Sequence, residues 1–166
     1  MLKDLREGYF GGHTDVYKTC NNNQPLYVYD VNSLYPYVMS QFEMPIGNIT
    51  YFEGDIIKAT DKIPYGFFKV EIETPDNLNV PILMTKANIN DSSIKRTMAP
   101  LGTWTGVIFS EEMVNAMKFG YNFKNLNGYT FDKGFIFKDC VNDLYAIKQS
   151  HHKDDPMYLI SKLLLN

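Results

Sequence analysis

Alternating hydrophobic and polar residues predict several strands along this chain of 166 residues. The clearest is Gly66–Glu73, where apolar and charged residues alternate until Pro75 ends the run. Four other segments are short apolar runs or extended stretches broken by Asn and Gly: Leu26–Asp30, Val80–Thr85, Thr103–Phe109 and Tyr121–Phe131. Between the second and third of these, the polar segment Lys86–Gly102 is predicted to be irregular.

Helical signals occupy four other segments. Pro36 suits the first turn of a short helix that ends near Phe42. Ser110 can cap a helix that ends at Phe119, because two glutamates follow it and Gly120 stops the run. The remaining two are an amphipathic helix and a helix with a cap residue and a proline at its start: Phe135–Ser150, and Pro156 onward behind Asp155.

The composition limits the class of protein. The chain is 45% hydrophobic and 14% aromatic, as in a globular domain, and its net charge is −3. An acidic balance is a poor match to a protein that binds nucleic acid on its own. Cys20 and Cys140 are too few for a zinc site or a disulfide framework. No apolar run approaches ~20 residues, so we expect no membrane partner.

Residue usage points to the kind of genome. Asn, Lys, Ile, Tyr and Phe are common, with AT-rich codons, whereas Ala and Arg are scarce. This favours an organelle, a linear plasmid or a virus over the alternative of an AT-rich bacterium. The first residues form a charged lead-in and resemble neither a signal peptide nor a transit peptide. We therefore expect synthesis in a mitochondrion, with a viral or bacterial cytoplasm as the alternative.

The segment Tyr27–Pro36 carries the strongest chemical signal. An apolar run meets Asp30, a tight turn follows, and Pro36 comes next. A carboxylate in such a place can hold a metal ion, and the amides of the turn can hold phosphates. This segment resembles the first palm motif of family B DNA polymerases, Asp-x-x-Ser-Leu-Tyr-Pro. Residues on both sides make it most similar to the protein-primed branch.

The resemblance implies roles for the residues of this motif. Asp30 would be catalytic and a ligand of the first of two Mg²⁺ ions, with the Val31 carbonyl also touching metal. The amides of Ser33, Leu34 and Tyr35 would hold the triphosphate of a deoxynucleotide. Tyr35 would also be the steric gate against a 2′-hydroxyl. Without the motif, Asp30 reads as a turn cap and Tyr35 as a core aromatic.

Two weaker matches flank this motif. Tyr9, Gly11 and Gly12 resemble the Tyr-x-Gly-Gly signature and would contact template DNA, although a plain turn is the alternative. Near the other end, Lys162 and Asn166 resemble the start of the second polymerase motif and would bind nucleotide. The alternative for Lys162 is a solvated side chain on an amphipathic helix.

The resemblance also implies an α+β fold, made of a polymerase palm-type sheet with helices, a small β-rich insertion and the start of the fingers helices. It implies a domain plan and partners as well. Residues 1–75 would be the N-terminal part of the palm, and residues 76–134 an insertion that contacts the terminal protein. Residues 135–166 would begin the fingers and end inside the second motif, so we interpret the chain as a fragment that is inactive by itself. The full enzyme would bind template-primer DNA, deoxynucleoside triphosphates and the terminal protein primer.

Two other functions remain open. The chain could be an inactive remnant or a module that only binds the terminal protein. A metal-dependent nuclease should show clustered acidic residues, and none surround Asp30. The three histidines lack Cys or Glu at ligand spacing, so we expect His13, His151 and His152 to be surface or loop residues.

Overall fold

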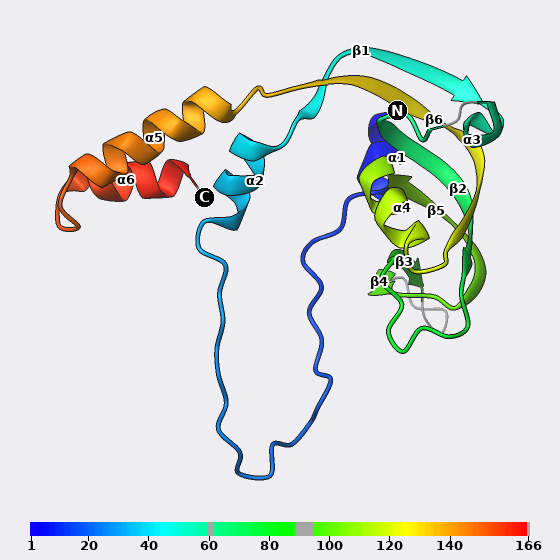
Figure 1. Ribbon diagram of the computed structural model, residues 1–166, viewed down its shortest axis with the longest axis horizontal. Coiled ribbons are helices and arrows are strands. Elements are labelled where there is room, and N and C mark those ends of the chain that lie inside the picture. The colour runs from blue at the N-terminus through cyan, green and yellow to red at the C-terminus, as the bar shows by residue number, and fades with distance from the viewer. Residues whose placement is uncertain (60–61, 89–94, 166) are drawn as a thin grey trace. The chain divides into compact units, whose positions relative to one another are not determined.

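The computed structural model describes residues 1–59, 62–88 and 95–165. Its backbone divides into two compact units. Unit 1 comprises residues 1–12 and 47–132, and unit 2 comprises residues 13–46 and 133–166. Figure 1 labels the helices and strands along the chain. Within the described ranges, no helix has the length and apolar character required to cross a bilayer. The mixture of sheet and helices confirms the α+β prediction.

A four-stranded sheet in the order β1-β6-β2-β5 organises unit 1. Its strands are Met44–Glu53, Asn122–Gly134, Gly66–Thr74 and Gly102–Phe109, in that order across the sheet. The central strand β2 runs antiparallel to both β5 and β6. Alternate residues of β2 are buried, which confirms the strand predicted from its pattern. The predicted strand at β5 and the extended stretch at β6 are confirmed as well.

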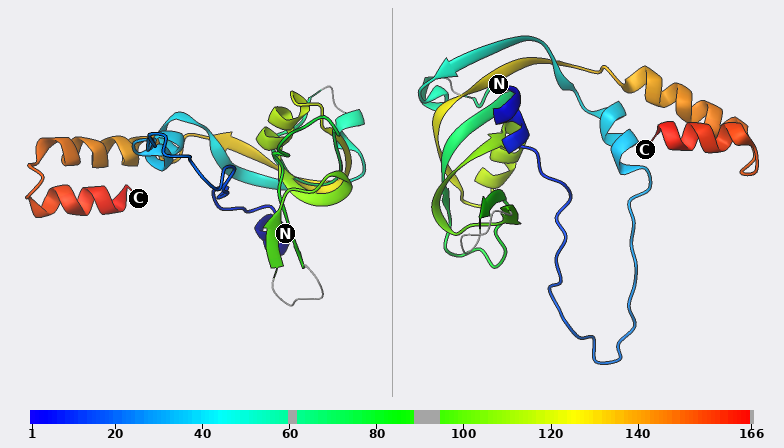
Figure 2. Two further views of the ribbon diagram at one scale, coloured as in Figure 1. Left: turned by 90° about the horizontal axis from the view of Figure 1, so that it is seen from below. Right: turned by 180° about the vertical axis from the view of Figure 1, so that it is seen from behind.

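One face of this sheet carries the core. Phe68, Val70 and Ile72 of β2 are fully buried and pack with Ile108 and with the apolar face of α4 (Ser110–Met117). Each such side chain contributes about 1.5–3 kcal/mol by leaving water. Because the strand alternates, the residues between them lie on the other face, where α1 (Leu2–Glu7) packs on β5. Figure 2 shows α1 and α4 on opposite sides of the sheet.

The start of α4 differs from the predicted cap. Phe109 holds the N-cap position, and the hydroxyl of Ser110 instead accepts a hydrogen bond from the Gly66 amide at 3.1 Å. Ser110 is 2% exposed, so its oxygen joins α4 to the first residue of β2 rather than closing the helix end. The helix also ends at Met117, before the predicted Phe119, and Gly120 follows with φ +88°.

The connection between β2 and β5 contradicts two predictions. Residues 80–84 form no strand, because the Ile82 amide donates to the Tyr121 hydroxyl at 3.0 Å instead of to a neighbouring strand. The segment predicted to be irregular contains the two-stranded sheet of β3 (Thr85–Asn88) and β4 (Lys95–Met98). The two strands are ordered by pairing with each other, which the polar sequence of the segment does not indicate.

The described residues of unit 2 form three helices, and α5 packs against both of the others. They are α2 (Leu34–Gln41), α5 (Lys138–Ser150) and α6 (Pro156–Leu164). The carboxylate of Asp155 accepts from the Met157 amide at 2.8 Å, which confirms the predicted cap with Pro156 behind it. The α5 helix is also confirmed, although it begins at Lys138 instead of Phe135.

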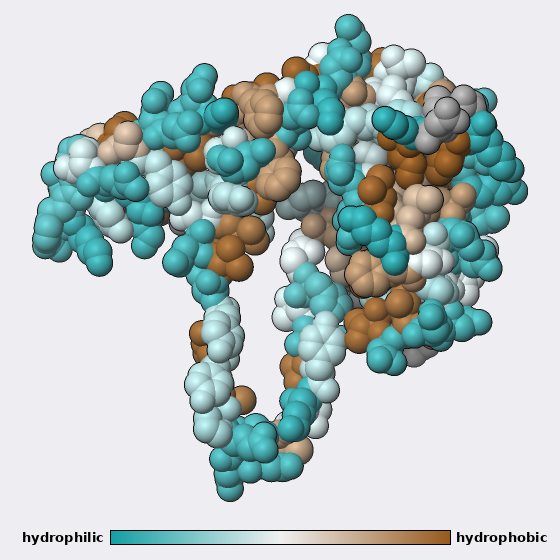
Figure 3. Space-filling view, in the orientation of Figure 1, coloured by the Kyte–Doolittle hydropathy of each residue, from teal (hydrophilic) through white to brown (hydrophobic). Residues whose placement is uncertain are grey.

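The predicted strand Leu26–Asp30 is wrong for this chain. These residues are extended but pair with no strand in the described ranges, and Val28 and Tyr29 are 95% and 90% exposed. Figure 3 shows the segment as a narrow run of spheres in which hydrophobic residues stand uncovered. A strand needs backbone partners and a covered face, and the local sequence supplies neither.

Candidate metal and nucleotide site

Asp30 presents an exposed carboxylate just before α2. The Val31 carbonyl follows directly, so two hard oxygen donors of the type that Mg²⁺ prefers come from adjacent residues. Their chemistry fits a magnesium site, but their number does not complete one. In the described part of the chain, no three His, Cys, Asp or Glu side chains come close enough to hold a metal. Asp30 can therefore supply only one side of a metal centre.

The amino end of α2 offers backbone donors next to Asp30. Ser33 is the N-cap residue and adopts the left-handed conformation, with φ 53° and ψ 43°. The first capping bond runs from the Tyr37 amide to the Ser33 carbonyl at 3.0 Å. Within the described residues, the amides of Ser33, Leu34 and Tyr35 donate to no backbone or side-chain acceptor that has been assigned. Such free amides at a helix start favour an anion.

Tyr35 and Pro36 point to different surroundings. Pro36 is buried, whereas Tyr35 is 71% exposed. The Tyr35 ring is therefore not packed in the core of this chain. An exposed ring one residue from a buried proline can contact a ligand bound at the helix start, since the proline fixes the backbone beneath it.

Lys162 lies in the last turn of α6 with an exposed side chain, next to the buried Ser161. The Ser161 hydroxyl donates to the Met157 and Tyr158 carbonyls at 2.8 and 3.0 Å, so its hydrogen-bond partners lie within the same helix. Figures 1 and 2 show the carboxyl end of α6 near α2. The other predicted residue of this motif, Asn166, lies outside the described residues.

The Tyr9–Gly12 segment belongs to unit 1. The ammonium group of Lys86 donates to the Tyr9 carbonyl at 3.0 Å and lies 5.3 Å from the centre of the Phe10 ring. A β-carbon at Gly11 or Gly12 would meet nothing within 4 Å, so open space surrounds both glycines. The two glycines therefore leave room for a ligand, and Lys86 fixes the residues before them.

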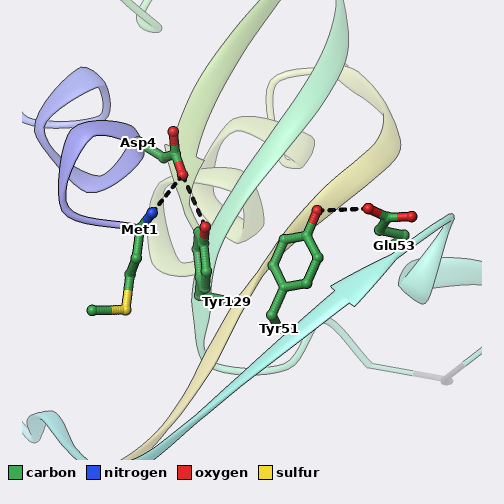
Figure 4. Close-up of polar contacts among 5 residues, drawn as sticks. All are labelled: Met1, Asp4, Tyr51, Glu53 and Tyr129. Atoms are coloured by element: carbon green, nitrogen blue, oxygen red, sulfur yellow. Dashed lines mark hydrogen bonds and ion pairs between the residues drawn. The ribbon is translucent and has the colours of Figure 1, made fainter.

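A polar cluster that the sequence did not reveal holds α1 on the sheet. Figure 4 shows the Asp4 carboxylate accepting from the Tyr129 hydroxyl and from the Met1 amino group, at 2.9 and 3.0 Å. The Tyr51 ring lies tilted against that of Tyr129, with the ring centroids 5.2 Å apart, and the Tyr51 hydroxyl donates to the Glu53 carboxylate. Hydrogen bonds from Met1 and Tyr129 lower the pKa of Asp4. The hydrogen bonds to Asp4 and Glu53, respectively, raise the pKa of Tyr129 and of Tyr51.

Among the residues that the structure describes, the histidines and cysteines form no group that could hold a metal ion. His13 lies 3.8 Å from Asp15, and His152 lies 3.2 Å from Asp154, both with exposed side chains. His151 contacts the Ile147 carbonyl at the end of α5. The two free cysteines are exposed, and their elements are far apart in sequence. All three histidines occupy loops, as the sequence predicted.

Comparison with known proteins gives consistent matches. The model of the family described as DNA polymerase type B, organellar and viral, matches residues 1–166. A probable DNA polymerase of Neurospora intermedia is 44% identical over 168 residues, covering 98% of this chain. The DNA polymerase of Bacillus phage Nf is 27% identical over 100% of this chain. The chain spans only 17% and 30% of these two relatives.

The fold of this chain is similar to part of a DNA polymerase of known structure. Phi29 DNA polymerase, solved with primer-template DNA and incoming nucleotide, aligns over 99% of this chain and 29% of its own length. The TM-score is 0.64 and the identity is 23%. At this identity the likeness establishes the fold.

Proposed function

This chain belongs to the organellar and viral type B DNA polymerases, and we propose that it is the part of such an enzyme that holds the first metal ligand and the incoming nucleotide. The whole enzyme would add deoxynucleotides to a primer along a DNA template. The single observation that carries this proposal is the sequence of exposed groups at the start of α2. A carboxylate, a carbonyl and three free amides follow one another within a few residues.

Asp30 would hold metal in this proposal, with the Val31 carbonyl beside it. Two Mg²⁺ ions would supply charge stabilisation at the attacking and leaving oxygens of the phosphoryl group. Ligands beyond Asp30 and Val31 must come from elsewhere in the enzyme, because the described residues contain no acidic cluster. For the same reason we expect the 166 residues alone to lack polymerase activity.

The groups around α2 would place the nucleotide. The amides of Ser33, Leu34 and Tyr35 would donate hydrogen bonds to phosphate oxygens, at a helix end where the dipole also favours negative charge. Lys162 would add a point charge to the same anion, and the nearness of α6 to α2 supports this role. Asn166, one turn further on, would face the nascent base pair. The exposed Tyr35 ring would lie under the sugar and exclude a 2′-hydroxyl.

Protein priming and the template contact extend the proposal. Tyr9, Gly11 and Gly12 would contact the template, which the open space around the glycines supports. Residues 1–75 would belong to the palm, 76–134 to the insertion that meets a terminal protein, and 135–166 to the fingers. The two compact units divide the chain at other positions. These three ranges therefore describe proposed roles and do not correspond to the compact units.

The origin of the gene is part of the same proposal. Fungal relatives and phage relatives both match the full chain, and an AT-rich residue usage fits an organelle or a linear plasmid. We place the protein in the mitochondrion. The competing function is a module that only binds the terminal protein. It is favoured by one observation: among the described residues, no three acidic, His or Cys side chains come together to hold a metal ion.

Substitution of Asp30 in the longer parent protein tests the polymerase proposal. Asp30→Asn keeps the size of the side chain but removes its charge, so primer extension should fall by roughly 10³-fold or more as one side of the metal clamp is lost. Asp15→Asn is the control, because Asp15 is another exposed aspartate of unit 2. Primer extension unchanged in Asp30→Asn would overturn the proposal and leave the binding module.

A further inference from the structure

Two polar side chains inside unit 1 have atoms without a hydrogen-bond partner. Within the described residues, the buried side-chain atoms that lack a partner are Oδ1 of Asp55 and both Oδ1 and Nδ2 of Asn125. Asn125 is 2% exposed. Nearly all buried donors and acceptors of folded proteins are bonded to protein or to ordered water, because an unpaired one loses its hydration without compensation. Two such side chains in one unit therefore indicate a bound ligand.

The strand β6 directs Asn125 toward the core. Asn125 stands opposite Val70 of β2, and opposite residues of antiparallel strands share a face of the sheet. Val70 is completely buried in the core, so the Asn125 amide lies on the core face as well. The next residue, Leu126, has no partner on β2, because the register shifts there and forms a β-bulge. An amide group thus enters the apolar core beside an irregularity of the sheet.

The turn after β1 brings Asp55 to the same end of the core. The Gly54 amide donates to the Leu126 carbonyl at 2.9 Å. Asp55 follows Gly54 and Asn125 precedes Leu126, so the two residues flank one backbone hydrogen bond. Directly after Asp55, the first residues of α3 (Ile56–Ala59) pack against the core. The unpaired groups therefore belong to two segments that the backbone already joins.

The two carboxylate oxygens of Asp55 have different surroundings. Oδ2 lies 3.5 Å from the ammonium nitrogen of Lys58, whose side chain is exposed, so this oxygen is directed to the surface. Oδ1 is buried and accepts no hydrogen bond, although Asp55 directly precedes α3, where an aspartate commonly caps the helix. One oxygen of Asp55 is therefore left for a ligand inside unit 1.

We propose that ordered water binds between Asp55 and Asn125 and joins the turn after β1 to the bulge of β6. The two side chains do not bond to each other directly. Water both donates and accepts, so it matches the two oxygens and the amide nitrogen, whereas a cation would match only the oxygens. Buried water molecules typically make about three hydrogen bonds to such groups.

Oxygen-17 magnetic relaxation dispersion of the 166-residue chain tests this proposal, because it counts the water molecules that stay inside a protein far longer than on its surface. Asn125→Leu replaces the amide by an apolar group of similar size, so it should hold fewer long-lived water molecules than the parent chain. Asn127→Leu is the matched control, since Asn127 stands opposite Lys69 on the other face of β6 and should leave the number unchanged. Equal numbers in the parent chain and Asn125→Leu would overturn the proposal.

Unfolding equilibria test whether the two residues share the water. Asn125→Leu leaves Oδ1 of Asp55 unpaired, so the equilibrium constant of unfolding should rise about tenfold. Asp55→Ala removes the other partner, so the effect of the double variant should fall short of the product of the single effects by at least about threefold. A neutral or stabilising Asn125→Leu would contradict the proposal, because an unpaired amide gains from apolar replacement. Independent effects of the two substitutions would contradict it as well.

Asp55→Ala also serves if Asn125→Leu does not fold, because Asp55 lies partly at the surface. It should lose the same long-lived water, and a number equal to that of the parent chain would speak against the site. Unfolding temperatures in sodium, potassium and tetramethylammonium chloride should differ equally in the parent chain and Asp55→Ala. Stabilisation by a small cation that Asp55→Ala abolishes would replace water by an ion and overturn the proposal. These measurements involve no DNA or nucleotide, so the Asp30 test does not affect them.

Discussion

The core face of the sheet and the segment before α2 use their apolar residues in opposite ways. Phe68 and Ile72 are completely buried against α4. Val28 is almost completely exposed, although it stands in the hydrophobic and aromatic run Leu26–Tyr29. The core residues secure unit 1 from within this chain. The segment before α2 instead leads to the exposed residues for which we propose chemistry. Stability and proposed catalysis therefore reside in different parts of the chain.

Truncating one apolar side chain in each of the two regions tests this division most strongly. Phe68→Ala should lower the free energy of unfolding by about 3–5 kcal/mol, because it removes a fully buried ring from the core. Val28→Ala should change it by less than about 0.5 kcal/mol, since that side chain already contacts water. Chemical denaturation of the two variants provides the measurement. A cost at Val28 comparable to that at Phe68 would show that the segment packs in solution.

Tyr35 offers a functional counterpart. In the longer parent, Tyr35→Val should relax the exclusion of ribonucleotides by roughly tenfold or more, because the wall under the sugar is shortened. The free energy of unfolding should hardly change, since the ring is exposed. Incorporation of matched deoxy- and ribonucleotides measures the first effect. Unaltered sugar discrimination would remove the gate role from Tyr35.

In unit 2, the cap residue Asp155 should contribute to the stability of helix α6. Asp155→Ala removes the bond to the Met157 amide and should cost about 1 kcal/mol of helix stability. Asp154→Ala is the control, because Asp154 precedes the cap and its carboxylate is exposed. Hydrogen exchange of the α6 amides reports the change. Equal exchange in the two variants would show that packing alone holds this helix.

The smallest expected effect concerns pH and the bond that holds α1. The folded-state pKa of Tyr129 is raised mainly by its hydrogen bond to Asp4, so the contribution of this bond is complete below the unfolded pKa. It is lost as pH rises through the raised folded pKa. The difference in thermal unfolding temperature between the parent chain and Tyr129→Phe should therefore shrink at alkaline pH. A difference that persists there would indicate packing in place of the hydrogen bond.

The hydrogen bond between Tyr129 and Asp4 should also weaken at acid pH, when Asp4 becomes protonated. Bonds from Met1 and Tyr129 lower the folded pKa of Asp4, so the contribution of its ionised form is present above the unfolded pKa. That contribution is lost as pH falls through the lowered folded pKa. Tyr51→Phe is the control, because Tyr51 pairs with Glu53 and leaves the bond between Asp4 and Tyr129 intact.

What could be predicted from the sequence depended on how local each signal was. The β2 strand and the Asp155 cap follow from residues within one turn or one strand, and both were confirmed. The strand β1 was missed, because Pro45 and Gly47 interrupt its pattern and its order comes from pairing with β6. The strand before Asp30 was predicted wrongly, since pairing cannot be read from one segment.

The candidate site shows the same dependence. The motif around Asp30 and Tyr35 is contiguous, so its residues could be named from the sequence alone, although their roles stay predictions. The water site proposed between Asp55 and Asn125 could not be found in that way, because its groups come from the turn after β1 and from β6. Asn125 lies in a stretch whose asparagines and glycine indicate turns, and nothing local shows that its side chain faces the core. Only the folding of unit 1 brings these side chains to one end of the core.

The uncovered segment before α2 also bears on solubility. Residues Leu26–Tyr29 include a β-branched and two aromatic side chains, and their backbone groups pair with no strand in the described part of the chain. Exposed segments of this kind favour pairing between identical chains, which leads to aggregation. Asp30 ends that run with a negative charge, and stacked copies would place these charges against each other. The carboxylate proposed to bind metal thus also acts as a gatekeeper against self-association while the segment lacks a partner strand.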